Sequence, residues 1–199
     1  MTAWRGGAGE RMRRIGVLAL QGDVREHARV LTALGVEPVR VKHPGQLNEI
    51  DGLIIPGGES TTIGTLSVRF GLLEPLAKAI GEGLPTYGTC AGLIFLSARL
   101  TEGEQPLLGV LDVTVQRNAF GRQNESFEMS LEVAGLEYPF PGVFIRAPWV
   151  AKVGTHVDVL AEVAGHPVMV REANVLASSF HPEMTDDTRI HHLFLEEIH

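Results

Sequence analysis

The sequence of 199 residues predicts an α/β fold of three layers, with a central, mostly parallel sheet, helices on both faces and a mixed or antiparallel extension. In the first half, short continuous apolar runs alternate with segments of helical periodicity, which is typical of buried parallel strands and their crossover helices. In the second half, strand-like runs follow one another with few helical segments between them, which indicates antiparallel pairs. Together these patterns favour a flavodoxin-like sandwich that continues into an antiparallel region.

The first half contains four expected strands and four expected helices. Apolar runs predict the strands at 14–20, 36–41, 52–55 and 84–88. Helical spacing predicts one helix between Asp23 and Gly35, its candidate N-cap and C-cap, and further helices over 61–70, 73–80 and 91–98. In such a sheet, functional sites lie beyond the carboxyl ends of the strands, which is where Gly57, Gly58 and Cys90 fall.

The second half is expected to consist mainly of short strands, at 110–116, 126–133, 142–146, 157–163, 168–172 and 175–180. Two of these are expected to form a hairpin around Ala164-Gly165, and a loop at 181–183 is expected to lead into a terminal helix over 185–198. Residues 1–13 are rich in Gly and Arg and are expected to be a disordered extension, which leaves 14–199 as a single domain.

Composition and charge argue against several classes of protein. The formal net charge of −7 disfavours a nucleic-acid partner, because phosphate binding needs a basic surface. No apolar run approaches the length that spans a membrane, so we expect no membrane association. Cys90 is the only cysteine, so no intrachain disulfide can form and a reducing compartment, the cytoplasm, is the natural setting.

Cys90 lies in the segment Gly88-Thr-Cys-Ala-Gly92, where the fourth strand turns into a helix. This is the form of a nucleophile elbow with Cys in place of Ser, and the glycines fit because flanking side chains would collide in so tight a turn. The helix N-terminus beneath the thiol favours the thiolate, and the N–H of Ala91 is placed to bind a developing oxyanion. A lone cysteine is more often an inert buried residue, so the interpretation requires a matching base.

His181 is the candidate base among the eight histidines, since the others give no comparable pattern. Pro182 holds His181 extended, so that His181 and Glu183, two residues apart, face the same side. A carboxylate on one imidazole nitrogen fixes the tautomer and leaves the other nitrogen for a thiol. An ordinary solvated His–Glu pair is the competing interpretation, which the cysteine elbow disfavours. No His-Glu-x-x-His pattern occurs, and we expect neither a metal nor a cofactor.

The loop Pro56-Gly-Gly-Glu-Ser60 follows the third expected strand and has three interpretations. It could cradle a phosphate at a helix N-terminus, although it lacks the Gly-Lys-Ser/Thr ending of a P-loop. It could instead supply a second oxyanion donor, since Gly57 and Gly58 allow a close backbone approach. It could also be a plain strand-to-helix turn.

The cysteine elbow and the distant His181-Pro-Glu183 together resemble the class I, or triad, glutamine amidotransferases. Further stretches are similar to one family among them, the glutaminase subunits of pyridoxal 5′-phosphate synthase (PdxT/SNO): Leu20-Gln-Gly-Asp-Val-Arg-Glu-His27, Pro56-Gly-Gly-Glu-Ser-Thr-Thr62, Arg117-Asn-Ala-Phe-Gly-Arg-Gln123, Phe144-Ile-Arg-Ala-Pro148 and Ser179-Phe-His-Pro-Glu-Met-Thr185. The resemblance extends from about Ile15 to the C-terminus, and the stretches that begin at Arg117 and Phe144 are more specific than the elbow.

The resemblance implies a role for each matching residue. Cys90 would be the nucleophile, His181 the base and acid, and Glu183 its orienting partner. L-Glutamine would be held by Gly58, Glu59, Ser60, Arg117, Ile145 and Arg146, and the oxyanion by Gly57, Gly58 and Ala91. The ammonia would pass to a barrel-fold synthase subunit, in a large hetero-oligomer that makes pyridoxal 5′-phosphate in vitamin B6 biosynthesis.

The residues by themselves leave other functions open. A stand-alone cysteine hydrolase or peptidase would use the same elbow without a partner, and another amidotransferase could use the same glutaminase chemistry. A non-enzymatic ligand-binding module of flavodoxin-like form would leave Cys90 dispensable. The expected domain at 14–199 contains no second unit that could consume ammonia, so the glutaminase interpretation requires a separate partner.

Overall fold

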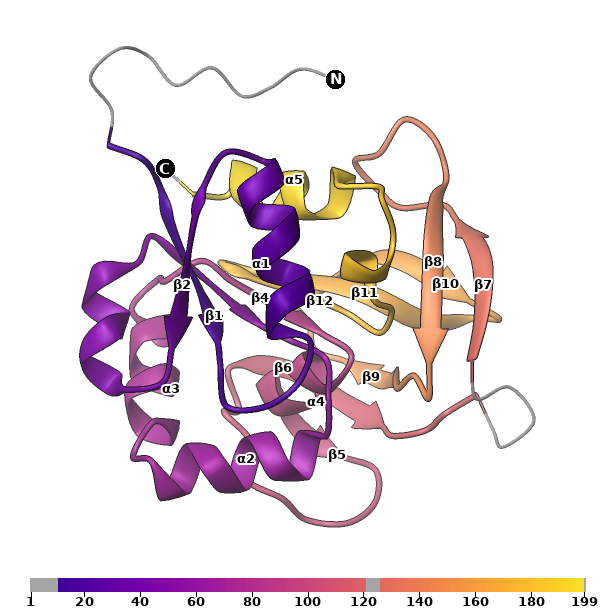
Figure 1. Cartoon of the computed structure of the whole chain (residues 1–199). Coiled ribbons are helices and arrows are strands. Elements are labelled where there is room, and N and C mark those ends of the chain that lie inside the picture. Colours follow the sequence, from indigo (N-terminus) through magenta and orange to yellow (C-terminus); the bar gives the residue numbers. More distant parts are fainter. Residues whose placement is uncertain (1–10, 121–125, 199) are drawn as a thin grey trace.

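The computed structural model describes residues 11–120 and 126–198, built around a seven-stranded sheet of order β10-β11-β12-β4-β3-β1-β2 (Figure 1). The parallel strands are β2 (Glu37–Val41), β1 (Arg14–Leu18), β3 (Gly52–Ile55), β4 (Thr86–Thr89) and β12 (Val175–Ser178). Two antiparallel strands, β11 (His166–Glu172) and β10 (Asp158–Val163), complete the sheet and form the expected hairpin. The mostly parallel sheet with an antiparallel extension is therefore confirmed.

Helices cover both faces of the sheet, as the sequence predicts. One face carries α1 (Val24–Ala33) and α5 (Arg189–Glu196); the other carries α2 (Ser60–Arg69), α3 (Leu73–Gly81) and α4 (Ala91–Leu96). The alternation of side chains along β3 separates two apolar cores: Ile54 belongs to the core under α1 and α5, whereas Leu53 and Ile55 belong to the other. Two cores on opposite faces of one sheet make the three layers.

Two smaller sheets form the extension. One contains β5 (Ser97–Leu100), β6 (Leu111–Gln116) and β9 (Trp149–Val153); the other pairs β7 (Ser126–Leu131) with β8 (Phe140–Ile145). Stacked Phe127 and Phe144 rings, with centroids 4.7 Å apart, join β7 to β8. The sequence did not predict β5 or β9, and the expected helix over 91–98 ends at Leu96 because Ser97 adopts an extended conformation.

The chain after β12 also differs from the expectation. A short 3₁₀ helix, η3 (Pro182–Met184), replaces the expected loop, and α5 begins at Arg189 rather than at Thr185. Side-chain hydrogen bonds explain the late start: the Thr185 hydroxyl accepts the N–H of Asp187 at 3.2 Å, and the Asp187 carboxylate accepts the N–H of Arg189 at 3.0 Å. A second 3₁₀ helix, η1 (Pro44–Glu49), follows β2, where a simple break was expected.

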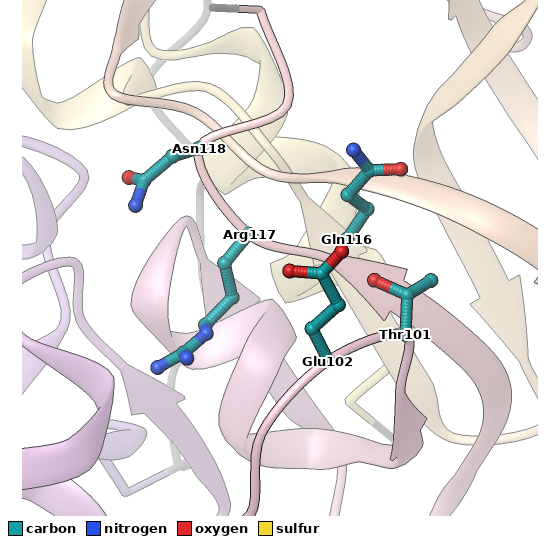
Figure 2. A pocket seen from close by; sticks show the side chains of 5 residues that line it. All are labelled: Thr101, Glu102, Gln116, Arg117 and Asn118. Carbon is teal, nitrogen blue, oxygen red and sulfur yellow. The ribbon is translucent and has the colours of Figure 1, made fainter.

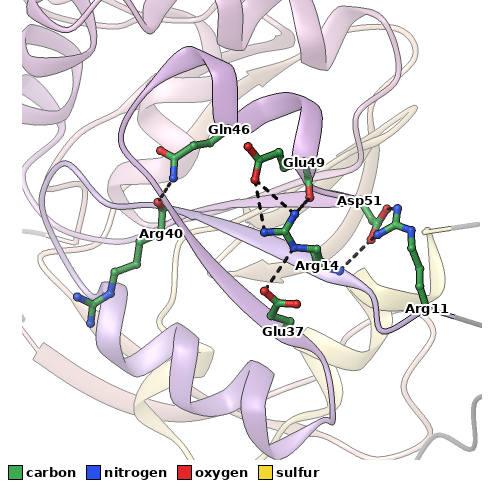
Figure 3. Close-up of polar contacts among 7 residues, drawn as sticks. All are labelled: Arg11, Arg14, Glu37, Arg40, Gln46, Glu49 and Asp51. Atoms are coloured by element: carbon green, nitrogen blue, oxygen red, sulfur yellow. Dashed lines mark hydrogen bonds and ion pairs between the residues drawn. The ribbon is translucent and has the colours of Figure 1, made fainter.

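The start of the sheet is held by charged side chains, and Figure 3 shows how they surround Arg14. The backbone N–H of Arg14 donates to the Asp51 carboxylate at 2.8 Å, and Arg11 pairs with the same carboxylate. Arg13 donates to a backbone carbonyl of α5 at 2.9 Å. Arg11 and Arg13, at the end of the stretch expected to be disordered, thus contact the domain, while residues 1–10 lie outside the described part of the chain. Among the described helices, none has the length and apolar character to cross a membrane.

Candidate active site

Cys90 lies at the turn between β4 and α4, in a backbone conformation that is rare for any residue but glycine. Its φ is 48°, in the left-handed region, and its N–H donates to the Ser178 carbonyl of β12 at 2.7 Å. A Cβ atom on Gly92 would lie 2.2 Å from the carbonyl oxygen of Ile55, and one on Gly88 would lie 2.8 Å from the backbone of Gly92. Only glycines therefore allow α4 to fold back so closely on the sheet.

His181 and Glu183 contact each other, as expected, although Pro182–Met184 form a 3₁₀ turn rather than the extended segment on which that expectation rested. His181 Nδ1 lies 2.8 Å from Glu183 Oε1, in a position where His181 is 4% exposed and Glu183 is fully buried. The backbone N–H of His181 donates to the Val143 carbonyl of β8 at 2.8 Å, so the antiparallel extension holds the histidine in place. The Cys90 thiol is close enough to the imidazole to raise the pKa of His181.

Asp23 is a second carboxylate at this histidine, and the sequence analysis assigned it a different role. Asp23 is the N-cap residue of α1, as expected, but its side chain makes no capping hydrogen bond. Its Oδ2 atom lies 3.5 Å from His181 Nδ1 instead. Attraction between a carboxylate and a largely buried imidazole explains the change of partner. Asp23 follows β1 at the carboxyl edge of the sheet, and this position could have identified it as a candidate site residue from the sequence.

The surroundings of His181 stabilise its charged form. Burial lowers the pKa of His181, but hydrogen bonds with Asp23, Cys90 and Glu183 outweigh burial and raise the pKa to about 12. Burial raises the pKa of Glu183, and the hydrogen bond and charge of His181 oppose that effect. An imidazolium is therefore the stable partner of Cys90 at neutral pH, and it carries a proton that a leaving group can take.

The glycine loop after β3 lies against this histidine. A Cβ atom on Gly57 would lie 2.4 Å from His181 Cε1, and one on Gly58, whose φ is 152°, would lie 2.3 Å from Gln21 Oε1. The Gly57 carbonyl accepts the N–H of Asp23 at 3.1 Å. Ala91, the third expected oxyanion residue, begins α4 and is buried. The loop thus joins the base to the segment that follows β1.

The N-terminus of α2 is occupied by side chains of the protein itself. The Glu59 carboxylate accepts the N–H groups of Thr61 and Thr62 at 3.2 and 2.7 Å, and the N–H of Glu59 donates to Gln21 Oε1 at 2.7 Å. Burial raises the pKa of Glu59, but these hydrogen bonds outweigh burial and lower it overall. A phosphate would need the same N–H groups, so the structure disfavours the phosphate-cradle interpretation. It assigns Glu59 a capping role that the sequence analysis did not foresee.

Gln105 brings together two of the expected glutamine-binding residues. Its Oε1 atom accepts hydrogen bonds from Ser60 Oγ and from the Arg117 guanidinium, both at 3.2 Å. Gln105 Nε2 is buried without a hydrogen-bond partner among the described residues. The sequence analysis missed Gln105 because the loop between β5 and β6 carries no recognisable motif.

Arg117 also lines a small hollow at the end of β6, together with Thr101, Glu102, Gln116 and Asn118 (Figure 2). In Figure 2, Arg117 and the preceding Gln116 extend in different directions. Neither the cysteine nor the His–Glu pair lines this hollow. Residues 121–123, which end the motif that begins at Arg117, lie outside the described part of the chain.

The end of β8 approaches the cysteine, where the sequence places two more expected binding residues. The Ile145 carbonyl lies 3.9 Å from Cys90 Sγ. Arg146 is exposed and has a φ of 44°, a left-handed conformation that a non-glycine residue adopts at a cost. The structure therefore brings the Ile145 carbonyl to the cysteine. Arg146, the next residue, has a strained backbone conformation.

Asp23, His181 and Glu183 also offer three atoms, within 4.8 Å of one another, that could bind a metal ion. The imidazole nitrogen of that set is already hydrogen-bonded to Glu183 at 2.8 Å. An ion there would therefore compete with the contact that orients the histidine.

Two more histidines lie buried behind the His181–Glu183 pair. His27 Nδ1 of α1 is 2.9 Å from His191 Nε2 of α5, and His27 Nε2 is 3.2 Å from Thr89 Oγ1 and 3.5 Å from Glu183 Oε2. Burial lowers the pKa of His27 well below its ordinary value, and burial lowers the pKa of His191 to about 4. Both imidazoles are therefore neutral in the folded protein at neutral pH.

The low pKa of His191 predicts a loss of stability in acid. Between about pH 4 and pH 6.5 the unfolded chain binds a proton at His191 that the folded chain does not, so the free energy of unfolding decreases as the pH falls. The expected slope is at most about 1.4 kcal/mol per pH unit for this group. Urea unfolding from pH 6.5 to about pH 5 should show a steeper loss for wild type than for His191→Gln.

The neighbouring His192 provides the matched control for this measurement, because its side chain is 42% exposed. His192→Gln should keep the pH dependence of the wild type. Equal slopes for wild type and His191→Gln would contradict a buried neutral His191.

Replacement of the Glu183 carboxylate should show how much the rate depends on the orientation of His181, because the variant keeps the imidazole that transfers the proton. For the glutamine hydrolysis that the resemblance implies, we expect Glu183→Gln to lower kcat by about 10²–10⁴, because the amide holds the wrong imidazole tautomer and stabilises the imidazolium poorly. Steady-state assays of glutamate formation measure the effect. If Glu183→Gln had the kcat of wild type and Glu59→Gln were inactive, the carboxylate that orients the base would be Glu59.

The class of protein follows from the fold and its cysteine turn. A solved structure described as a glutamine amidotransferase is 53% identical to this chain, covers 92% of it and 98% of its own length, and superposes with a TM-score of 0.89. The structure of PurLQS from Thermotoga maritima, at 18% identity, covers 95% of this chain and 98% of its own, and shares the fold with a TM-score of 0.68. The chain thus has the fold of the class I glutamine amidotransferases.

The family can be named more closely. The model of the SNO glutamine amidotransferase family matches residues 17–199, and the chain belongs to that family. A curated relative from Frankia alni, "Pyridoxal 5′-phosphate synthase subunit PdxT", is 58% identical over 186 residues, which cover 92% of this chain and 94% of the relative.

Proposed function

We propose that this chain is the glutaminase subunit of a pyridoxal 5′-phosphate synthase and acts in vitamin B6 biosynthesis. The observation that carries the proposal is the strained turn at Cys90 beside the buried His181–Glu183 pair. Membership of the SNO family and the name of the Frankia alni relative support the choice of glutamine as substrate and of this synthase as the assembly. The free thiol of Cys90 suits a reducing compartment, and we propose the cytoplasm.

The chemistry can be followed through the site residues. His181 already holds the proton of Cys90 as an imidazolium, and the resulting thiolate attacks the side-chain carboxamide of glutamine. The N–H of Ala91 and an N–H of the Gly57-Gly58 loop bind the oxyanion of the tetrahedral intermediate. His181 then protonates the departing ammonia, which leaves a glutamyl thioester on Cys90. His181 takes a proton from water, which attacks the thioester, releases glutamate and restores the thiol.

The remaining expected residues are proposed to bind the substrate. Gly58, Glu59, Ser60, Arg117, Ile145 and Arg146 would surround the glutamine. The hydrogen bonds of Gln105 to Ser60 and Arg117 support this assignment, because they bring a hydroxyl and a guanidinium together at a single carboxamide oxygen. The contact of the Ile145 carbonyl with Cys90 Sγ supports a binding position next to the nucleophile.

A partner is required because ammonia released into water near pH 7 is mostly protonated, and ammonium is not a nucleophile. We therefore propose delivery through a sheltered path to a barrel-fold synthase subunit in a large hetero-oligomer. In the isolated chain Cys90 is only 7% exposed, and the Gly57 carbonyl is bound by the N–H of Asp23. Since a Gly-Gly peptide can change its orientation at little steric cost, docking could order the oxyanion loop and switch hydrolysis on.

Steady-state glutamate formation tests this proposal, with the isolated chain compared with its mixture with the synthase subunit. We expect a large increase on mixing, absent from a mixture made with Cys90→Ala. We also expect Gly58→Val to lose the increase, because a Cβ at this position meets Gln21 Oε1 at 2.3 Å. Equal rates with and without the synthase subunit would contradict the coupling and favour a stand-alone hydrolase.

A further inference from the structure

We propose that His27 is a positioning residue of the glutaminase reaction: its Nε2–H holds the second carboxylate oxygen of Glu183, and His191 selects the His27 tautomer that can do so. This inference rests on the function proposed above, because it concerns the same catalytic centre. It extends the centre by two buried side chains, one on α1 and one on α5.

The second oxygen of Glu183 is the observation that requires a partner. Oε1 of this carboxylate contacts His181, but Oε2 is buried and has no hydrogen-bond partner among the described residues. An unpaired carboxylate oxygen away from water is costly, so a donor is expected nearby. His27 Nε2 lies 3.5 Å from Glu183 Oε2, so a small shift of either side chain toward the other would form an N–H···O hydrogen bond. Catalytic hydrogen bonds are often long before substrate binds and shorten in the complex.

The tautomer of His27 follows from what each nitrogen faces. A carboxylate can only accept, so the nitrogen that faces Glu183 Oε2 must carry the proton. His27 Nδ1 is then an acceptor, and it lies 2.9 Å from His191 Nε2, which must be the donor. This leaves His191 Nδ1 without a proton, and that atom is buried without a described partner.

The other tautomer of His27, protonated on Nδ1, would create two unfavourable contacts, whereas the favoured one leaves a single unpaired nitrogen. It would point the His27 Nε2 lone pair at the carboxylate, and it would leave an N–H of His191 buried without an acceptor. In the favoured arrangement the His27 Nε2–H also donates to the Thr89 hydroxyl at 3.2 Å, so its hydrogen bond is bifurcated. Proton donation therefore runs in one direction, from His191 to His27 and from His27 to Glu183.

A neutral histidine suits this role better than a cation would. Burial lowers the pKa values of both His27 and His191, so neither competes with His181 for the charge of Glu183. With an N–H donor on each oxygen, the carboxylate is held at both ends and cannot rotate away from His181 Nδ1. Because α1 and α5 supply the two histidines, the packing of these helices fixes the orientation of the base.

Nuclear magnetic resonance of the ring nitrogens tests the tautomers in the wild-type chain, without any substitution. We expect both His27 and His191 to be neutral and protonated on Nε2 at pH 7. A proton on Nδ1 of His27, or a charged His27, would overturn the proposal whatever the activity of the protein.

Matched variants test the catalytic consequence in the complex with the synthase subunit. His27→Gln keeps an amide N–H near the position of Nε2, whereas His27→Asn reaches only the position of Nδ1. We expect His27→Asn to lower kcat about tenfold or more, with KM changed less than about threefold, because a misplaced base loses rate rather than binding. His27→Gln should recover most of that loss. His192→Asn, half-exposed and next to His191, should behave as wild type.

An equal loss in both His27 variants, or no loss in either, would overturn the positioning role. The test is separate from that of the proposed function. If wild type itself forms no glutamate in the complex, the glutaminase proposal fails, and the tautomer measurement still decides the hydrogen-bond order at His27 and His191.

Discussion

Cys90→Ala is expected to lower kcat for glutamine hydrolysis by at least about a thousandfold in the complex with the synthase subunit. The reaction as proposed passes through a thioester, and the chain has no other cysteine that could form one. Cys90→Ser should be similarly impaired, because a hydroxyl gives up its proton to His181 far less readily than a thiol does. Glutamate formation under saturating glutamine measures both variants.

Folding of the Cys90 variants must be checked separately, by thermal unfolding and by binding to the synthase subunit. Both should be preserved, because the change is a single atom in a turn held by backbone contacts such as the Cys90 N–H with the Ser178 carbonyl. Turnover of Cys90→Ala within about tenfold of wild type would exclude covalent catalysis at this residue.

His181→Ala is expected to be nearly as damaging, with kcat reduced by about a thousandfold. The variant removes the group that accepts the thiol proton and then protonates ammonia. It also leaves Glu183 fully buried with its principal partner gone, so we expect a loss of stability of about 3 kcal/mol. Assays of glutamate formation and urea unfolding measure the two effects independently.

His181→Gln and His192→Ala serve as companions to this variant. The amide of His181→Gln can still donate to Glu183, so it should recover part of the stability and none of the turnover. His192→Ala should change neither quantity, because the His192 side chain is 42% exposed and, within the described part of the chain, pairs with Glu196 on the same helix. Turnover of His181→Ala close to that of wild type would remove this residue from the mechanism.

The buried strands of the central sheet could be predicted because burial on both faces leaves a continuous apolar run. The bounds of β3, Gly52–Ile55, agree with the prediction for this reason. Strands β5 and β9 could not be predicted in the same way, because their exposed faces carry Arg99 and Lys152 and interrupt the apolar pattern. Both strands pair in a small separate sheet, where tertiary contacts rather than local sequence decide the conformation.

The contact between His181 and Glu183 was predictable because it is local, two residues apart around a proline. The approach of Asp23, His27 and His191 depends on how α1 and α5 pack on the sheet, and no local pattern encodes it. A signal was nevertheless present: both histidines share a helix face with apolar residues three or four positions away, and a histidine on such a face needs a buried partner.

Covalent trapping is the most direct test of the central claim, that Cys90 is the nucleophile of a glutaminase. The complex with the synthase subunit is treated with a glutamine analogue that carries an electrophile, and the chain is examined by intact mass and peptide mapping. We predict one adduct, located on Cys90, that forms in step with the loss of glutamate formation and more slowly when glutamine is present. Loss of activity without an adduct on Cys90 would contradict the account.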